Sequence, residues 1–184
     1  MDLINRAKNI MLKPAQEWRV IAAESADVGS LLRDYAAPIS GVAAVCQWLG
    51  LSTLFGVAGI GFARTATSAA VSWILGLLSL WVAAIVIENL APSFGSRGGT
   101  VQALKLVVYA STPLWIVGIL TLVPPLGALF IVGVIYAIWL FYLGLPSVLE
   151  TPRDRVVPYM LTSAVIVFIA NFVVRAAARL VAGV

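Results

Sequence analysis

The chain has 184 residues, of which 61% are hydrophobic and only 11% are charged. Soluble domains carry about 25% charged residues, so a water-exposed surface is excluded for most of the chain, and the bilayer must be its solvent. Lysine and arginine form no basic stripe, histidine is absent, and Cys46 is the single cysteine. We therefore expect no nucleic-acid partner, no metal or other cofactor, and no internal disulfide.

The first thirty residues predict short amphipathic helices at the membrane surface. A cleavable signal peptide is not expected, because no continuous apolar segment follows the first basic residues before Glu17. Apolar side chains recur at helical spacing in residues 2–12, and the opposite face is polar and basic. This helix suits an anionic lipid surface or packing against the end of a bundle, and both roles can hold. The candidate membrane-surface residues are Arg6, Lys8, Lys13 and Trp18.

Uncharged segments long enough to cross a bilayer follow along the chain. Residues 106–149 form the longest, and as one helix they would extend roughly 66 Å, about twice the hydrocarbon thickness. Pro124 and Pro125 therefore predict a fold-back, and Gly56, Gly59 and Gly61 predict a turn after the first span. We predict one all-α, polytopic domain over residues 1–184, with five transmembrane helices at about 35–57, 67–89, 101–122, 126–146 and 157–179.

Small residues recur every four positions in the second predicted span, at Ser68, Ser72 and Gly76. This spacing predicts close approach of a neighbouring helix in lipid. Gln47 is the one strongly polar residue midway along the first span, where a bridge between helices is the first interpretation and conduction the second.

The distribution of positive charge predicts the orientation of the five spans. Cytoplasmic loops are enriched in lysine and arginine. With the N-terminus inside, nine such residues lie on the inner side: Arg6, Lys8, Lys13, Arg19, Arg33, Arg97, Lys105, Arg153 and Arg155. Arg64, Arg175 and Arg179 lie outside. We expect a multi-pass protein of the cell's inner membrane, with a cytoplasmic N-terminus and an external C-terminus.

The polar stretch 88–113 contains the candidate site. Glu88 and Asn89 end the second span, and Lys105 and Tyr109 begin the third. An ionisable group at the edge of the hydrocarbon is costly unless it is paired, so a Glu88–Lys105 pair is predicted, with Asn89 and Tyr109 beside it. The cluster would either clamp two helices together or bind an ion, a lipid headgroup or a partner. Pro113 is expected to kink the third span.

The sequence resembles bacterial members of the Yip domain family, named after the Ypt-interacting proteins of eukaryotes. The similarity lies in AKNIMLKPAQEWRVIAAE at residues 7–24, in NLAPSFGSRGGTVQALKLVVYASTP at 89–113, in IYAIWLFYLGLP and in PRDRVVPYML. The positions that match the family pattern are Phe94, Gly95, Tyr109, Pro113, Tyr136, Tyr142, Gly144, Leu145 and Pro146.

The resemblance implies five spans and a cytoplasmic N-terminus. Eukaryotic members act in vesicle traffic and bind Rab-type GTPases. Their long cytosolic N-terminal region is not expected in this chain, so the resemblance favours a bacterial cytoplasmic membrane over a Rab-binding role. For that branch the resemblance implies a fold rather than an activity.

The sequence is compatible with two functions. The first is a non-enzymatic protein that organises the membrane through lipids, a membrane-protein partner or a second copy at its inner surface. The second is a small oligomeric transporter or channel, favoured by the polar cluster and the Pro113 kink. An enzyme is not expected, because no nucleophile–base, paired-carboxylate or metal-ligand pattern occurs within the spans.

Overall fold

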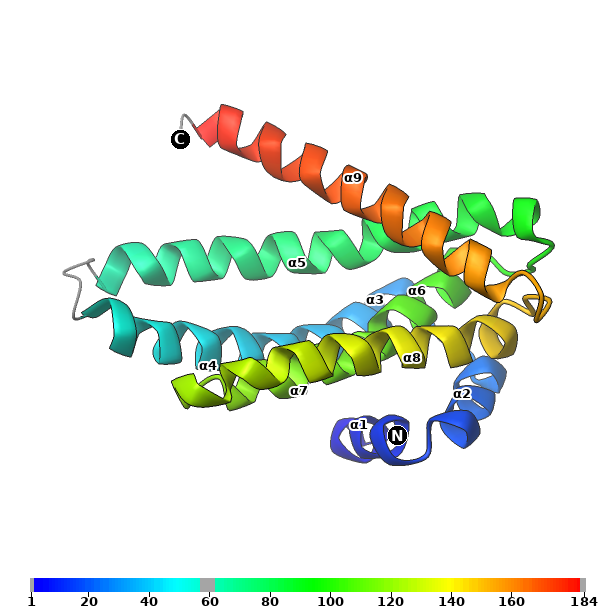
Figure 1. The fold of residues 1–184 in the computed structure, drawn as a ribbon, viewed down its shortest axis with the longest axis horizontal. Coiled ribbons are helices and arrows are strands. Elements are labelled where there is room, and N and C mark those ends of the chain that lie inside the picture. Colours follow the sequence, from blue (N-terminus) through cyan, green and yellow to red (C-terminus); the bar gives the residue numbers. More distant parts are fainter. Residues whose placement is uncertain (1, 57–61, 183–184) are drawn as a thin grey trace.

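The computed structural model describes residues 2–56 and 62–182, and every regular element within them is a helix (Figure 1). Its elements are α1 Leu3–Leu12, α2 Pro14–Ala23, α3 Val28–Ser30, the π-helical turn η1 Leu31–Ala36, α4 Ala37–Gly56, α5 Phe62–Leu90, η2 Ala91–Phe94, α6 Thr100–Ala110, α7 Thr112–Leu120, η3 Pro124–Leu129, α8 Phe130–Val148 and α9 Val156–Ala182.

Four helical segments are long and apolar enough to cross a membrane within the part of the chain that was described. They are Thr65–Phe94, Thr100–Leu120, Pro125–Val148 and Val156–Val173, and they match the second to fifth predicted spans. The first predicted span corresponds to α4. The predicted fold-back is confirmed, because η3 separates α7 from α8. Gly59 and Gly61, in the turn predicted after the first span, lie outside the described residues.

The third predicted span is one apolar helical segment, Thr100–Leu120, in which α6 is followed directly by α7. The amide of Ser111 donates to the carbonyls of Val107 and Val108, and α7 restarts at Thr112 with Pro113 in its first turn. Proline has no N–H to donate to the carbonyl four residues earlier, that of Tyr109, so the regular ladder ends there. The helix is therefore interrupted at Ser111, two residues before the proline at which the kink is predicted.

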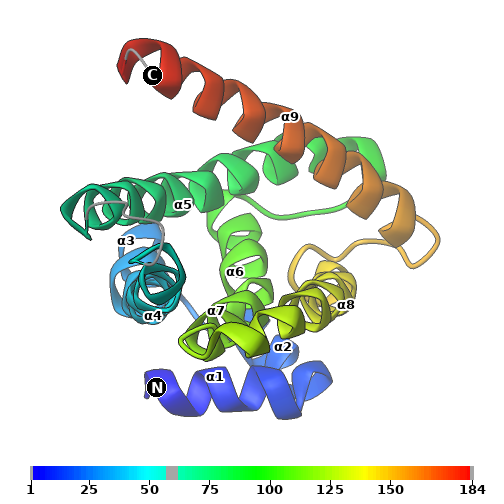
Figure 2. The same ribbon diagram turned by 60° about the vertical axis from the view of Figure 1, so that its left-hand side comes forward.

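Helix α6 lies at the centre of the fold. All residues from Ala103 to Ala110 are buried, because η1, α5 and α8 pack around this helix and α2 contacts it through Lys105 (Figure 2). A helix that is buried on every side must place any charged residue it carries inside the protein. Lys105 is such a residue, and its surroundings decide what the predicted cluster does.

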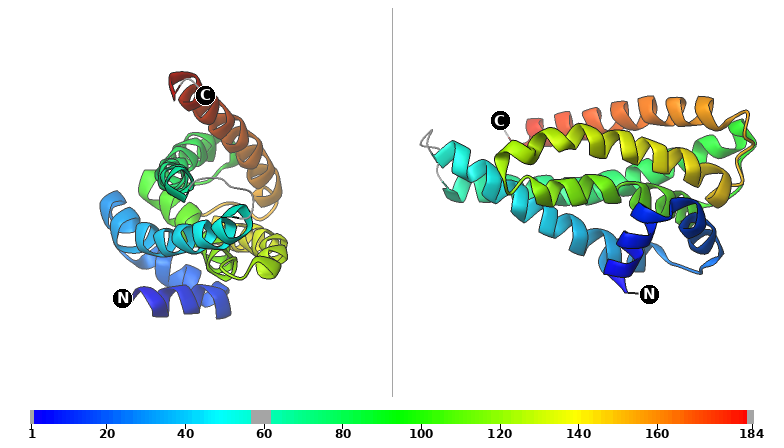
Figure 3. Two further views of the ribbon diagram at one scale, coloured as in Figure 1. Left: turned by 90° about the vertical axis from the view of Figure 1, so that its left-hand side faces the viewer. Right: turned by 60° about the horizontal axis from the view of Figure 1, so that its bottom comes forward.

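The connections gather at two ends of the bundle. The segments 91–99 and 149–155 lie at one end, beside α2, whereas η3 and the C-terminal end of α9 lie at the other (Figures 1 and 3). Helix α1 crosses beneath the bundle: Figure 1 shows it nearly end-on, and Figure 2 shows it lengthwise. It therefore runs across the long helices rather than along them.

Glycines allow close helix contacts at positions that the spacing of small residues did not indicate. A Cβ at Gly50 of α4 would lie 2.1 Å from the carbonyl oxygen of Thr121, and a Cβ at Gly118 of α7 would lie 2.4 Å from Nε2 of Gln47. At Gly76, in contrast, a Cβ would meet nothing within 4 Å. The contact predicted along Ser68, Ser72 and Gly76 is therefore wrong at Gly76, and α4 packs closely on α7 instead.

Candidate functional site: a buried polar cluster beneath the N-terminal helices

Lys105 binds the end of α2. Its ammonium group donates to the carbonyl oxygen of Ile21, 2.8 Å away, and to that of Glu24. These carbonyls belong to the last turn and C-cap of α2, where backbone acceptors lack helical partners and the helix dipole is negative. The side chain is buried. Lys105 thus joins the central span to the N-terminal segment.

Arg6 links α1 to α2 through two carboxylates. Its guanidinium donates to Oε1 of Glu17 at 2.5 Å and to Oε2 of Glu24. Arg6 and Glu17 are both buried, whereas the Glu24 side chain is partly exposed. Burial alone would lower the pKa of Arg6, but the hydrogen bond with Glu24 and the surrounding negative charge raise it above its ordinary value. Arg6 therefore stays cationic.

Aromatic rings fill the space between the N-terminal helices and the core. The Tyr109 ring packs edge-on against Tyr35, with centroids 4.6 Å apart, and against Trp18 at 6.4 Å. The guanidinium carbon of Arg6 lies 5.7 Å from the centroid of the Tyr109 ring, a cation–π distance. Tyr35 shares a 2.9 Å hydrogen bond with the hydroxyl of Thr112 at the start of α7. The aromatic layer thus reaches the break in the central span.

The predicted Glu88–Lys105 pair is not formed among the described residues. Glu88 accepts a 2.6 Å hydrogen bond from the hydroxyl of Thr100, across the turn from α5 to α6. Asn89 donates to the carbonyl of Ile85, within its own helix. Lys105 and Tyr109 share a face, as their spacing of four predicts, but that face meets α2 and not the end of α5. The predicted cluster is therefore two separate sites.

The predicted position at the membrane surface is wrong for two of the four candidate residues, Arg6 and Trp18. Arg6 is buried in the ion pairs, and Trp18 is fully buried, its ring beside Gly144 of α8 and Leu106 of α6. Lys8 and Lys13 do face outward. The apolar residues of α1 divide between two sides: Ile10 is buried, whereas Ile4 and Leu12 are 70% and 67% exposed.

The two connections beside α2 are joined to each other. Ser96 and Thr151 share a buried 2.9 Å hydrogen bond, and the amide of Arg97 donates to the carbonyl of Leu149 at 2.7 Å. Phe94 stacks on Tyr159, with centroids 4.8 Å apart. Gly95 has φ +67°, a left-handed conformation that favours glycine. The Phe94–Gly95 sequence is therefore explained by local structure: the phenylalanine ring stacks on Tyr159, and the glycine adopts a left-handed conformation.

Among the described residues, no three or more histidine, cysteine, aspartate or glutamate side chains lie together in a way that could hold a metal ion. The cluster that the structure does form is a neutralised assembly of Arg6, Lys105, Glu17 and Glu24. Its chemistry is that of a rigid attachment: cations on α1 and α6 satisfy carboxylates and carbonyls of α2.

The sequence model of a family described as the Yip1 domain matches residues 8–174 of the chain. No curated protein and no solved structure matches. The matched segment begins within α1 and ends within α9, so it includes Glu17, Glu24 and Lys105 of the buried cluster and both joined connections, whereas Arg6 lies two positions before it.

Proposed function

The chain belongs to the Yip1 domain family, and on this premise we propose that it is a non-enzymatic membrane protein that organises the inner face of a bacterial cytoplasmic membrane. In this proposal, α1 and α2 form a protein surface that binds anionic lipid headgroups. A membrane-protein partner or a second copy would be recruited at the same face.

The proposal includes five spans and a cytoplasmic N-terminus. Helix α4, the first in chain order, would complete the set of five spans. Its 20 residues carry no charge, and at 1.5 Å per residue it is about 30 Å long, the thickness of the hydrocarbon core. The excess of lysine and arginine at the end that contains α2 and segments 91–99 and 149–155 supports placing that end inside.

The observation that carries the proposal is that the outer side of α1 exposes both large apolar side chains and lysines. Ile4, Lys8 and Leu12 are exposed at intervals of four residues, so they share one face of the helix, and the exposed Lys13 follows. Large apolar side chains interspersed with lysine suit the boundary between headgroups and acyl chains. Because α1 runs across the long helices, this face can lie along the membrane plane (Figure 2).

The attachment by Arg6 and Lys105 gives this surface a fixed position. An isolated helix of ten residues is marginal in water, because nucleation is costly. Here two buried cations hold α1 and α2 against α6, so the lipid-facing residues are preorganised. Binding to lipid then costs little further conformational entropy.

The proposal is tested by reconstituting the full chain in nanodiscs that contain either zwitterionic lipid alone or about one third phosphatidylglycerol. We expect slower amide hydrogen exchange in α1 with the anionic lipid. A Lys8→Gln/Lys13→Gln variant should lose most of the difference, whereas Arg33→Gln, which removes an exposed charge elsewhere, should keep it. Equal exchange of α1 in both lipids would refute a role for anionic headgroups.

A transporter is the second candidate, and the break at Ser111 favours it. Central spans interrupted by proline occur in transporters, where the freed backbone groups bind substrate. Liposomes containing the wild-type chain would then show ion or solute flux, and Lys105→Met would change it. Flux equal to that of empty liposomes would remove this candidate.

A further inference from the structure

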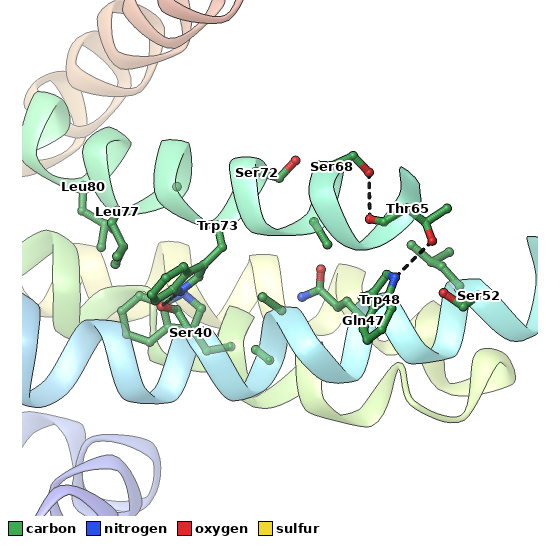
Figure 4. A pocket seen from close by; sticks show the side chains of 16 residues that line it. Ser40, Gln47, Trp48, Ser52, Thr65, Ser68, Ser72, Trp73, Leu77 and Leu80 are labelled. Carbon is green, nitrogen blue, oxygen red and sulfur yellow. Dashed lines mark hydrogen bonds between the residues drawn. The ribbon is translucent and has the colours of Figure 1, made fainter. Parts of the chain in front are cut away.

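A cavity of about 410 Å³ lies between α4 and α5, along residues 40–52 and 65–80 (Figure 4). It differs from the buried cluster in position and in chemistry. Its lining contains serines, threonine, glutamine and the indoles of Trp48, Trp73 and Trp115. A cavity of this volume is large enough for a small ligand.

The cavity exists because α4 and α5 do not pack closely here. Gly76 faces open space, and α4 packs against α7 at Gly50 and Gly118 instead. Bridges between side chains hold the two helices apart: Nε1 of Trp73 donates to Oγ of Ser40 at 2.9 Å, and Nε1 of Trp48 donates to Oγ1 of Thr65 at 3.1 Å. These two bridges connect α4 to α5 on either side of Gln47.

Hydrogen-bonding groups remain for a ligand. The Gln47 amide lines the cavity with its Nε2 close to Gly118 of α7, and no bond joins it to the other residues drawn in Figure 4. The hydroxyl of Ser52 is shielded from solvent and has no hydrogen-bond partner among the described residues. Unsatisfied polar groups are costly in a bilayer, so a partner for them is expected from outside the chain.

The lining also determines which ligand class fits. None of the described lining residues is charged, so a phosphate would find no counter-ion in this low-dielectric setting. Leu51, Leu77 and Leu80 supply an apolar wall. We propose that the cavity binds an uncharged amphiphile of the membrane, with its hydroxyl-bearing head at Gln47 and Ser52 and its apolar part against these leucines.

The probe for a test is tritiated 1,2-dioctanoylglycerol, an uncharged lipid with a free hydroxyl, added to the purified full-length chain in detergent. Gly76→Leu fills the cavity from a position where a side chain meets open space. Gln47→Leu removes the amide and keeps a side chain of similar size. Gly127→Leu is the matched control, since a Cβ at Gly127 in η3 also meets nothing within 4 Å.

We expect saturable binding to the wild-type chain and to Gly127→Leu, and at least about tenfold weaker binding to Gly76→Leu. Loss of the hydrogen bond in Gln47→Leu should weaken binding by about fivefold. Unlabelled dioctanoylglycerol should compete, and dioctanoyl phosphatidylglycerol should not.

Three results would overturn the proposal: no saturable binding, wild-type affinity in Gly76→Leu, or equal competition by the anionic lipid. A wild-type dimer that Gly76→Leu converts to a monomer, without diacylglycerol binding, would instead assign the cavity to a second copy. All of these outcomes are independent of the role of α1.

Discussion

The ammonium group of Lys105 in α6 lies 2.8 Å from the carbonyl oxygen of Ile21 in α2, and the two residues are 84 positions apart in the chain. This contact ties the N-terminal helices to the most buried helix of the fold. It explains how a charged residue is accommodated in a central helix: its ammonium group donates to two carbonyls at the acceptor-rich end of another helix.

Replacing Lys105 by methionine should release α2. The carbonyls of Ile21 and Glu24 would lose a buried donor, and each such loss costs about 1–3 kcal/mol. We expect faster amide hydrogen exchange in residues 14–23 and unchanged exchange in α9. Lys8→Met, which removes an exposed lysine on α1, is the control and should leave the exchange of α2 as in the wild-type chain.

Replacing Arg6 by methionine should destabilise the chain strongly. Glu17 would remain buried without its cation, and breaking a buried ion pair from one side costs about 3–5 kcal/mol. Thermal unfolding in detergent should show a clear fall in Tm, which Glu17→Gln added to Arg6→Met should partly restore. Arg33→Met breaks an exposed pair with Asp34 and should leave the Tm close to that of the wild-type chain.

Gly144→Ala should disturb the contact between α2 and α8. A Cβ there would lie 2.4 Å from Cδ1 of Leu106 and 2.9 Å from the Trp18 ring, and overpacking of a filled core costs about 1–3 kcal/mol. Gly76→Ala makes the same change where there is space, so its Tm should be no lower than that of the wild-type chain. Equal losses in the two variants would contradict this packing.

Glu88 and Lys105 should act independently. Because Glu88 binds Thr100 and Lys105 binds α2, a double-mutant cycle with Glu88→Gln and Lys105→Met should give additive losses of stability, within about 0.5 kcal/mol. A coupling energy well above that value would show that Glu88 and Lys105 interact, as the sequence predicts, and would contradict the separate sites seen here.

The sequence is sufficient for the long helices and insufficient for the site. Uncharged runs and the Pro124–Pro125 pair predict the helices because hydrocarbon length and proline chemistry act locally. The partners of Lys105 are backbone carbonyls far along the chain, and carbonyls leave no mark in a sequence. A pairing with Glu88 is the simplest match between opposite charges in the sequence, but the carbonyl acceptors at the end of α2 bind Lys105 instead.

Arg6 shows a second reason why the site could not be predicted from the sequence. Its spacing places it on the polar face of α1, and that pattern suits lipid headgroups and packing against the end of the bundle equally well. The available signal was Glu17, an acidic residue in a short apolar helix whose charge needs a partner when buried. Only the angle at which α1 meets α2 brings the two side chains together, and that angle depends on the whole fold.

The most direct test of the account is the environment of residue 12. A spin label is attached to Leu12→Cys in a Cys46→Ala background, in vesicles containing phosphatidylglycerol, with Arg153→Cys as the reference for the joined connections. We predict that the label at position 12 collides with membrane-dissolved oxygen more often than with a water-soluble nickel chelate, and that the label at 153 shows the reverse. A label at position 12 that meets the nickel chelate as freely as the one at 153 would contradict the proposal that α1 lies on the membrane.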